Sequence, residues 1–154
     1  MHDVRDPTWL CKRIVEGSGD AVVFADRDGV IRLWNRGAED IFGYSGTEAI
    51  GRTLDLIIPK KLQERHWEGY RRVMETGVTR YGRDVLAVPA VHKDGTRRSI
   101  EFTVALVRED GGSLVGIAAI LRDVTKRFEE ERRLRARLRV LEERVQDKDE
   151  PPRS

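Results

Sequence analysis

Among the residues of this chain that could take part in chemistry, a histidine in the middle of a predicted helix comes first. Pro59 suits the first turn of a helix and Gly77 the position just past its end, so one helix is predicted from Pro59 to Gly77. At about 100° per residue, His66 falls on the apolar arc of that helix. The other residues of this arc are Leu62, Gly69, Tyr70 and Val73, extended by Trp67 and Met74. An unpartnered buried imidazole costs about 1–3 kcal/mol. His66 therefore either finds a hydrogen-bond partner in the core or coordinates a ligand, and helix geometry leaves both readings open.

The remaining candidates for chemistry are weaker. His92 falls in a predicted turn, His2 lies near the start, and Cys11 is a single cysteine, with no partner for a disulfide or a Cys-x-x-Cys zinc site. The sequence shows no Ser/His/Asp set, pair of buried carboxylates or phosphate-binding loop, so no enzymatic activity is expected. This cysteine usage favours the reducing cytoplasm.

The composition indicates one globular domain with tails. The 154 residues are 36% charged and 39% hydrophobic, with a net charge of +2. No apolar run approaches the roughly 18 residues that span a membrane, and the start does not read as a signal peptide, so no membrane partner is expected. Glutamates interleave with the arginines of the C-terminal stretch, which argues against nucleic acid as a partner.

Helical and strand periodicities together place His66 in an α+β domain. The predicted elements are, in order, an amphipathic helix over 7–15, strands over 21–25 and 30–34, short helices over 38–42 and 45–50, the helix over 59–77, and strands over 84–91, 96–107 and 113–121. Turn sequences with glycine join consecutive strands, which favours antiparallel hairpins. We therefore predict a five-stranded antiparallel sheet with helices on one face, above all the helix over 59–77.

The composition shifts sharply after Thr125. Residues 126–145 are rich in Glu, Arg and Leu, and an apolar seam of the coiled-coil type runs along them, formed by Leu134, Leu138, Leu141 and Val145. At about three heptads this seam is short, and it suits pairing with a copy of itself or with the first helix. The predicted organisation is an N-terminal helix over 1–17, a central domain over 18–125, a coiled-coil helix over 126–147 and a disordered tail over 148–154.

Several short motifs accompany this order of elements. They are the run from Asp20 to Ala25 with the Asp28-Gly29 turn, Trp34 to Glu39 followed by Phe42-Gly43-Tyr44, Ile50-Gly51, Asp94-Gly95-Thr96, and Arg122-Asp123-Val124-Thr125 before the last helix. In combination they resemble a PAS domain of the S-box type, although no one of them is specific alone. The resemblance covers about Ser18 to Thr125 and implies the PAS fold for the ordered core.

Residues 58–66 are in turn similar to the long helix of the haem-binding PAS domains, those of the FixL-type oxygen-sensor kinases and the Dos-type haem phosphodiesterases. In that branch a histidine at the place of His66 is the proximal iron ligand, so the resemblance implies haem b held on His66. It also implies propionate contacts from Arg72 and Arg80, whose other reading is ordinary solvated arginine. The apolar slot would be lined on the helix side by Leu62, Gly69, Tyr70 and Val73, and on the sheet side by Ile100, Phe102, Val104, Ile117 and Ala119.

The distal side departs from the haem-binding branch. The Dos-type methionine ligand falls on Asp84, and the distal arginine of both families falls on Leu86. The resulting distal pocket is apolar and lined by Leu86, Phe102 and Val104. It lacks a donor for bound dioxygen unless Tyr81 or Arg83 swings in. We therefore expect no methionine–iron bond, and carbon monoxide, nitric oxide or redox state as better candidate signals than dioxygen.

Two functions of different class follow. The first is a haem-bound sensor of a diatomic gas or of redox state, in which ligand binding at the iron shifts the pairing of the C-terminal helix through residues 123–125. The second is a cofactor-free PAS module that forms a homodimer through the first and last helices, and another small ligand in the same slot is a third possibility. The output is expected to pass to a separate chain or to a part of the parent protein outside this sequence.

Overall fold

The computed structural model describes residues 1–80, 82 and 84–149, and the chain divides into two compact units, Met1–Asp123 and Val124–Ser154. The first unit contains α1 (Pro7–Gly17), β1 (Ala21–Asp26), β2 (Ile31–Trp34), α2 (Arg36–Phe42), α3 (Gly46–Ala49), the short 3₁₀ helix η1 (Leu54–Leu56), α4 (Lys60–Thr76), β3 (Leu86–Val91), β4 (Arg97–Arg108) and β5 (Leu114–Asp123). The second unit contains α5 (Thr125–Asp149). Of the tail predicted over 148–154, residues 148 and 149 belong to α5, and 150–154 lie outside the described residues.

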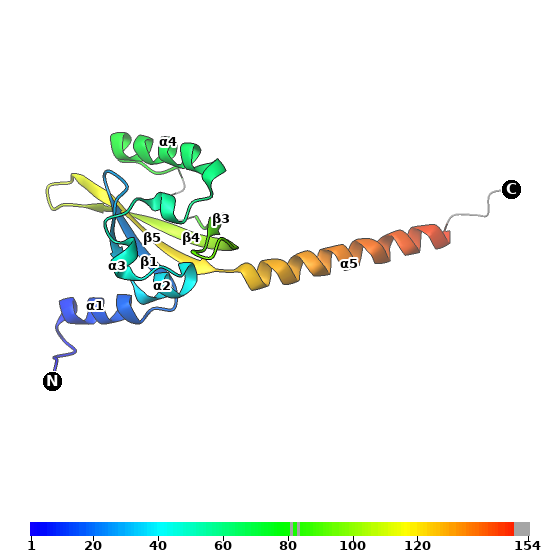
Figure 1. Ribbon diagram of the computed structural model, residues 1–154, viewed down its shortest axis with the longest axis horizontal. Coiled ribbons are helices and arrows are strands. Elements are labelled where there is room, and N and C mark those ends of the chain that lie inside the picture. The colour runs from blue at the N-terminus through cyan, green and yellow to red at the C-terminus, as the bar shows by residue number, and fades with distance from the viewer. Residues whose placement is uncertain (81, 83, 150–154) are drawn as a thin grey trace. The chain divides into compact units, whose positions relative to one another are not determined.

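The five strands form one antiparallel sheet in the order β2-β1-β5-β4-β3 (Figure 1). The three hairpins predicted from glycine-containing turns are present, joining β1 to β2, β3 to β4 and β4 to β5. The remaining contact pairs β1 with β5, so that Ala21 lies opposite Leu121 and Asp26 opposite Gly116. The predicted α+β class with a five-stranded antiparallel sheet is confirmed.

The turn between β1 and β2 is held by the side chain of Asp26. Its Oδ1 accepts hydrogen bonds from the backbone N–H groups of Asp28 (3.0 Å) and Val30 (3.1 Å), and its Oδ2 accepts one from Arg32 Nε (2.8 Å). Gly29 completes the turn at a φ of +76°, where a side chain would be strained. These contacts make the turn a firm support for the helix that packs against it.

A buried asparagine joins the start of the sheet to the first helices. Asn35 is 1% exposed and caps α2, because its Oδ1 accepts from the N–H of Ala38 (3.0 Å) as well as from that of Val22 (2.8 Å). Its Nδ2 donates to the carbonyls of Val15 (2.7 Å) and Asp20 (3.0 Å). The full hydrogen-bonding capacity of the amide is used, which explains why it can be buried.

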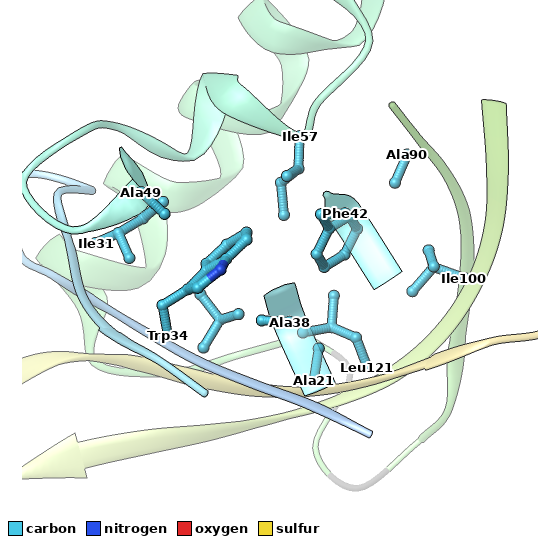
Figure 2. Close-up of a cluster of buried hydrophobic side chains, with 11 residues drawn as sticks. Ala21, Ile31, Trp34, Ala38, Phe42, Ala49, Ile57, Ala90, Ile100 and Leu121 are labelled. Atoms are coloured by element: carbon cyan, nitrogen blue, oxygen red, sulfur yellow. The ribbon is translucent and has the colours of Figure 1, made fainter. Parts of the chain in front are cut away.

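Two hydrophobic clusters lie on the same face of the sheet. The first, shown in Figure 2, consists of Ala21, Val23, Ile31, Trp34, Ala38, Phe42, Ala49, Ile57, Ala90, Ile100 and Leu121. The second consists of Ala25, Tyr70, Met74 and Leu114. Because Ala21, Val23 and Ala25 alternate along β1, their side chains point to one face. This face is covered by α2 and α4, as predicted for α4.

The first helix, α1, packs loosely. Asp6 caps it, with its Oδ1 accepting from the N–H of Thr8 (3.0 Å). None of its residues is buried, and the side chains of its apolar stripe stay in contact with solvent: Leu10 is 39% and Ile14 61% exposed. Of the amphipathic pattern that predicted α1, Leu10 and Ile14 are therefore exposed, whereas Trp9 and Val15 are half-buried.

Candidate functional site

The helix α4 places His66 over the sheet. Gly77 ends it in a left-handed conformation, with φ at +68°, and the N–H of Gly77 bonds to the carbonyl of Val73 at 2.8 Å. Tyr70 and Met74 are its buried residues, and His66 lies one turn before Tyr70 on the same face. The start and end predicted from Pro59 and Gly77 match the helix.

Two aromatic side chains fix α4 to the first hairpin. The Tyr70 hydroxyl donates to the carbonyl of Asp26 (2.6 Å) and also lies 3.1 Å from the carbonyl of Ala25. Burial raises the pKa of this hydroxyl, so it remains a donor. The Trp67 indole N–H donates to Asp55 Oδ1 at 2.6 Å. The Trp67 ring packs so closely on Gly29 that a Cβ at position 29 would lie only 2.1 Å from the ring. The helix cannot rotate about its axis without breaking these contacts.

His66 itself is half-buried and incompletely partnered. Its Nδ1 is fully buried and has no hydrogen-bond partner within the described part of the chain. The ring stands edge-on to Trp67, with centroids 4.9 Å apart, and is tilted against Tyr70 at 5.8 Å. Burial lowers the pKa of His66, and the negative charge of Asp55 opposes this only in part. The imidazole is therefore neutral at neutral pH, the form in which it can act as a metal ligand.

The sheet residues opposite α4 are only partly covered. Phe102 and Ala119 pack against the first cluster, and Ile117, with Val73 of α4, packs against the second. Leu86 lies opposite Phe102, and Val104 lies opposite Ala119 in the neighbouring strand. The half-buried side chains of Leu62, Leu86 and Val104 belong to neither cluster as described. Val104 lies on β4 between Phe102, which packs against the first cluster, and Leu106, which packs against the second, so half-buried apolar side chains continue along this strand.

Two residues predicted to line the slot lie elsewhere. Gly69 is exposed and has open space where a Cβ would be, so its expected place on the inner arc is wrong. The reason is that the inner face centres on Tyr70 and Met74, and Gly69 points about 100° away from Tyr70. Ile100 is only 1% exposed and is part of the first cluster, which makes it a core residue rather than a lining of free surface.

The two arginines expected near haem propionates are on the surface. Arg72 is exposed and lies 3.8 Å from Glu68 one turn earlier in the helix, and Arg80 is exposed beyond the end of α4. On the distal side Asp84 is exposed and Leu86 half-buried. Tyr81 and Arg83, the expected substitute donors, lie outside the described residues.

Sequence reasoning missed the polar anchor of the site. Asp55, in a stretch predicted as a plain connection, accepts the Trp67 hydrogen bond and is the charge that acts on His66. The one related signal in the sequence is Gly29 in its turn motif, because a glycine lets another side chain come close to the backbone. Nothing in the sequence connects Gly29 with Trp67. The contacts of Trp67 with Asp55 and Gly29 arise only in the folded chain, which brings η1 and the first hairpin against α4.

The comparisons with known proteins agree on one family. Residues 15–129 match the family described as PAS fold. An uncharacterized protein of Azorhizobium caulinodans is 35% identical over 80% of this chain, Sensor protein FixL of Bradyrhizobium diazoefficiens 27% over 75%, and Oxygen sensor protein DosP of Escherichia coli 30% over 68%. The matches cover 17%, 22% and 13% of those proteins, so the chain spans about a fifth or less of their length.

A solved structure agrees with this assignment. The crystal structure of the PAS domain of a protein from Colwellia psychrerythraea has a TM-score of 0.69 and 27% identity, and the match covers 79% of this chain and 99% of that one.

Among the helices that the structure describes, none has the length and apolar character to cross a membrane.

Proposed function

The chain belongs to the PAS family, whose relatives include signal-transduction sensor proteins, and we propose that it binds haem b on His66 and senses a diatomic gas or redox state. The candidate gases are carbon monoxide, nitric oxide and dioxygen. The observation that carries the proposal is the buried Nδ1 of His66, which has no partner among the described residues. A core that leaves an imidazole nitrogen unpaired sacrifices stability, and such a group is a candidate for a functional role.

The residues around His66 fit an apolar, flat cofactor held by one imidazole. The neutral ring needs no proton removed before it binds a metal. The lining would come from Leu62, Tyr70 and Val73 of α4 and from Leu86, Phe102, Val104, Ile117 and Ala119 of the sheet. Haem would supply a redox-active iron that can bind a diatomic gas. Arg72, which lies 3.8 Å from Glu68, and Arg80 are both exposed and would serve the propionates.

The sequence resemblance adds independent support. Residues 58–66 are similar to the histidine-bearing helix of the haem-binding PAS domains, and two of the relatives are named as sensors. The distal surface of this chain offers Leu86 where those domains have an arginine. We therefore propose carbon monoxide, nitric oxide or redox state ahead of dioxygen as the signal.

The signal would leave the site through β5. Ile117 and Ala119 line the proposed site, and the same strand runs on to Asp123, where the chain continues into α5. Arg122 near the end of β5 is bound to Asp20, the residue just before β1, through two bonds, Nε to Oδ1 at 3.1 Å and Nη2 to Oδ2 at 2.9 Å. We propose that a shift of β5 is passed to α5 and from there to an effector on another chain or outside this sequence. We also propose that the protein works in the reducing cytoplasm, which its single cysteine, Cys11, favours.

The visible spectrum tests the proposal. Protein purified with haem available should show a strong Soret band, and His66→Gly should lose it while keeping the far-ultraviolet dichroism of the folded domain. Added imidazole should restore the band in His66→Gly, because it can fill the space of the missing ring. His92→Gly is the matched control and should bind haem like the natural protein.

A second candidate function has its own observation. Leu10 and Ile14 of α1 and the apolar seam of α5 are exposed, as expected for a cofactor-free module that works by forming a homodimer. A colourless protein that takes up no haem, yet associates, would support this function and contradict the haem proposal.

A further inference from the structure

Asp55 places a carboxylate in the surroundings of the His66 imidazole. The residue lies in η1 and is half-buried, and its Oδ1 accepts the indole N–H of Trp67 at 2.6 Å. The Trp67 ring in turn stands edge-on to His66, with the ring centroids 4.9 Å apart. Among the residues that the structure describes, Asp55 Oδ2 has no hydrogen-bond partner. The carboxylate therefore keeps capacity to accept a bond, and the fully buried Nδ1 of His66 is itself unpaired within the same residues.

The position of Asp55 is fixed through its backbone as well as its side chain. Gln63 of α4 donates through Nε2 to the carbonyl oxygens of Asp55 (3.4 Å) and Ile58 (3.1 Å). These bonds tie η1 and the chain after it to the first turns of α4, the helix that carries His66. The carboxylate and the imidazole are thus held by connected elements, as a group that acts on a binding site must be.

Anchoring an indole does not require a charge. The indole N–H of Trp34, in the first cluster, donates to the backbone carbonyl of Tyr44 at 2.9 Å. A half-buried carboxylate carries a desolvation cost that a carbonyl does not. Because a neutral acceptor would anchor Trp67 equally well, the carboxylate of Asp55 indicates a role for its charge.

The charge of Asp55 acts on His66 in one direction. It is the one charge of the described residues found to act on this ring, and it favours a raised pKa, against the larger effect of burial. The same attraction applies to any positive charge held at the ring. Ferric iron carries one more positive charge than ferrous iron, so a nearby carboxylate stabilises the ferric state more.

We propose that Asp55 acts through His66 to lower the reduction potential of iron bound there, and that the N–H of Trp67 moderates this effect by sharing the carboxylate. The inference rests on the proposed function, because it requires haem on His66. A lower potential keeps the iron ferric until a sufficiently strong reductant is present. Among the candidate signals it therefore favours redox state, with Asp55 setting the threshold.

Asp55→Asn removes the charge and keeps an oxygen that can accept the Trp67 N–H. In the full chain loaded with haem b, the ratio of ferrous to ferric iron at a fixed solution potential should rise about tenfold, which is a midpoint potential about 59 mV higher. Spectroelectrochemical titration at neutral pH, followed at the Soret band, measures the potential. Asp110→Asn makes the same charge change in the exposed turn between β4 and β5 and should leave the potential unchanged.

A double variant tests the part of Trp67. Trp67→Phe keeps an aromatic ring beside His66 but removes the indole N–H, so the carboxylate is no longer shared. Asp55→Asn should therefore raise the potential more in the Trp67→Phe background than in the natural chain. Comparing the two rises cancels any change in solvent access that Trp67→Phe causes by itself. Equal rises in both backgrounds would contradict the part assigned to Trp67.

Haem uptake separates this inference from the proposed function. A natural chain that takes up no haem would contradict both. If the natural chain shows the Soret band and His66→Gly loses it, a potential in Asp55→Asn that falls, or that shifts no more than in Asp110→Asn, would overturn the inference alone. Asp55→Asn should bind haem like the natural chain, because the imidazole is unchanged. Loss of haem from this variant would mean that Asp55 holds the site together rather than setting its potential, and would also overturn the inference.

Discussion

His66 combines a neutral ring with an unpaired buried nitrogen, and both follow from its neighbours. Trp67 and Tyr70 pack around the imidazole and are themselves tied down, the first by Asp55 and the second by the carbonyl of Asp26. Removing water from the ring disfavours its charged form, and the opposing pull of Asp55 is the smaller effect. Taking up a proton on His66 therefore raises the free energy of the folded state.

The pH dependence of stability should show this cost. In the unfolded chain His66 titrates near its ordinary value of 6.5, whereas its pKa in the folded chain is lower. Below about pH 6.5 the unfolded state therefore binds more protons, and the free energy of unfolding should fall as the pH falls toward the folded pKa. Urea unfolding across this range measures it for protein without cofactor. His66→Gln should remove this part of the slope, and an identical slope in both proteins would contradict the lowered pKa.

Tyr70 offers a second prediction at the scale of one residue. Tyr70→Phe removes the hydroxyl that donates to the carbonyl of Asp26 and lies 3.1 Å from that of Ala25, but it keeps the ring. We expect a loss of about 1 kcal/mol in the free energy of unfolding, because the bond of the hydroxyl is removed while the carbonyl of Asp26 keeps the N–H of Gly29 at 2.9 Å. Tyr44→Phe is the control, since that hydroxyl has no hydrogen-bond partner in the described part of the chain. Equal losses in the two variants would show that the hydrogen-bonded hydroxyl of Tyr70 stabilises the domain no more than the unbonded hydroxyl of Tyr44.

At the scale of elements, two helical glycines have opposite meanings. Gly37 in α2 is buried, and a Cβ there would lie 2.1 Å from the backbone carbonyl oxygen of Asp20, which cannot move without shifting β1. Gly69 in α4 is exposed, with open space around it. Gly37 lets α2 approach the chain at the beginning of β1, whereas Gly69 only lowers the stability of α4.

The same substitution at both glycines should therefore change stability in opposite directions. Gly37→Ala should destabilise the domain by about 1–3 kcal/mol through overpacking against the backbone. Gly69→Ala should stabilise it by up to about 1 kcal/mol through helix propensity, and should leave haem uptake unchanged. Chemical denaturation and the Soret band measure the two effects. Reduced haem uptake in Gly69→Ala would return Gly69 to the lining of the site.

Local patterns predicted the elements well because their signals are local. The capping box at Ser45 and Glu48 is present, with the Glu48 N–H bonding to Ser45 Oγ at 3.2 Å, and Asn35 caps α2. What could not be predicted is non-local. The pairing of β1 with β5 joins segments about a hundred residues apart, η1 has no periodicity of its own, and the bond from Asp55 to Trp67 depends on both. The apolar arc of α4 predicted that His66 faces the sheet, but the unpaired Nδ1 depends on its whole surroundings.

At the scale of the whole molecule, the two units are built on different principles. The first is held by its own clusters and contains all three tryptophans, Trp9, Trp34 and Trp67. The second is α5, whose 25 residues bury nothing among themselves. Most helical stability in proteins comes from packing of an apolar face, and α5 packs none of its residues, so its order should depend on association with a second copy.

This difference predicts two unfolding transitions with different concentration dependence. Tryptophan fluorescence reports only the first unit, and its melting temperature should not change on dilution if the copies pair through α5 alone. Ellipticity at the helical band also reports α5, and it should show an earlier transition that moves to lower temperature on dilution, because dissociation is favoured there. A chain ending at Thr125 should lose the earlier transition and keep the fluorescence melting temperature. A single transition seen identically by both probes at every concentration would mean that α5 takes its order from the first unit rather than from a second copy.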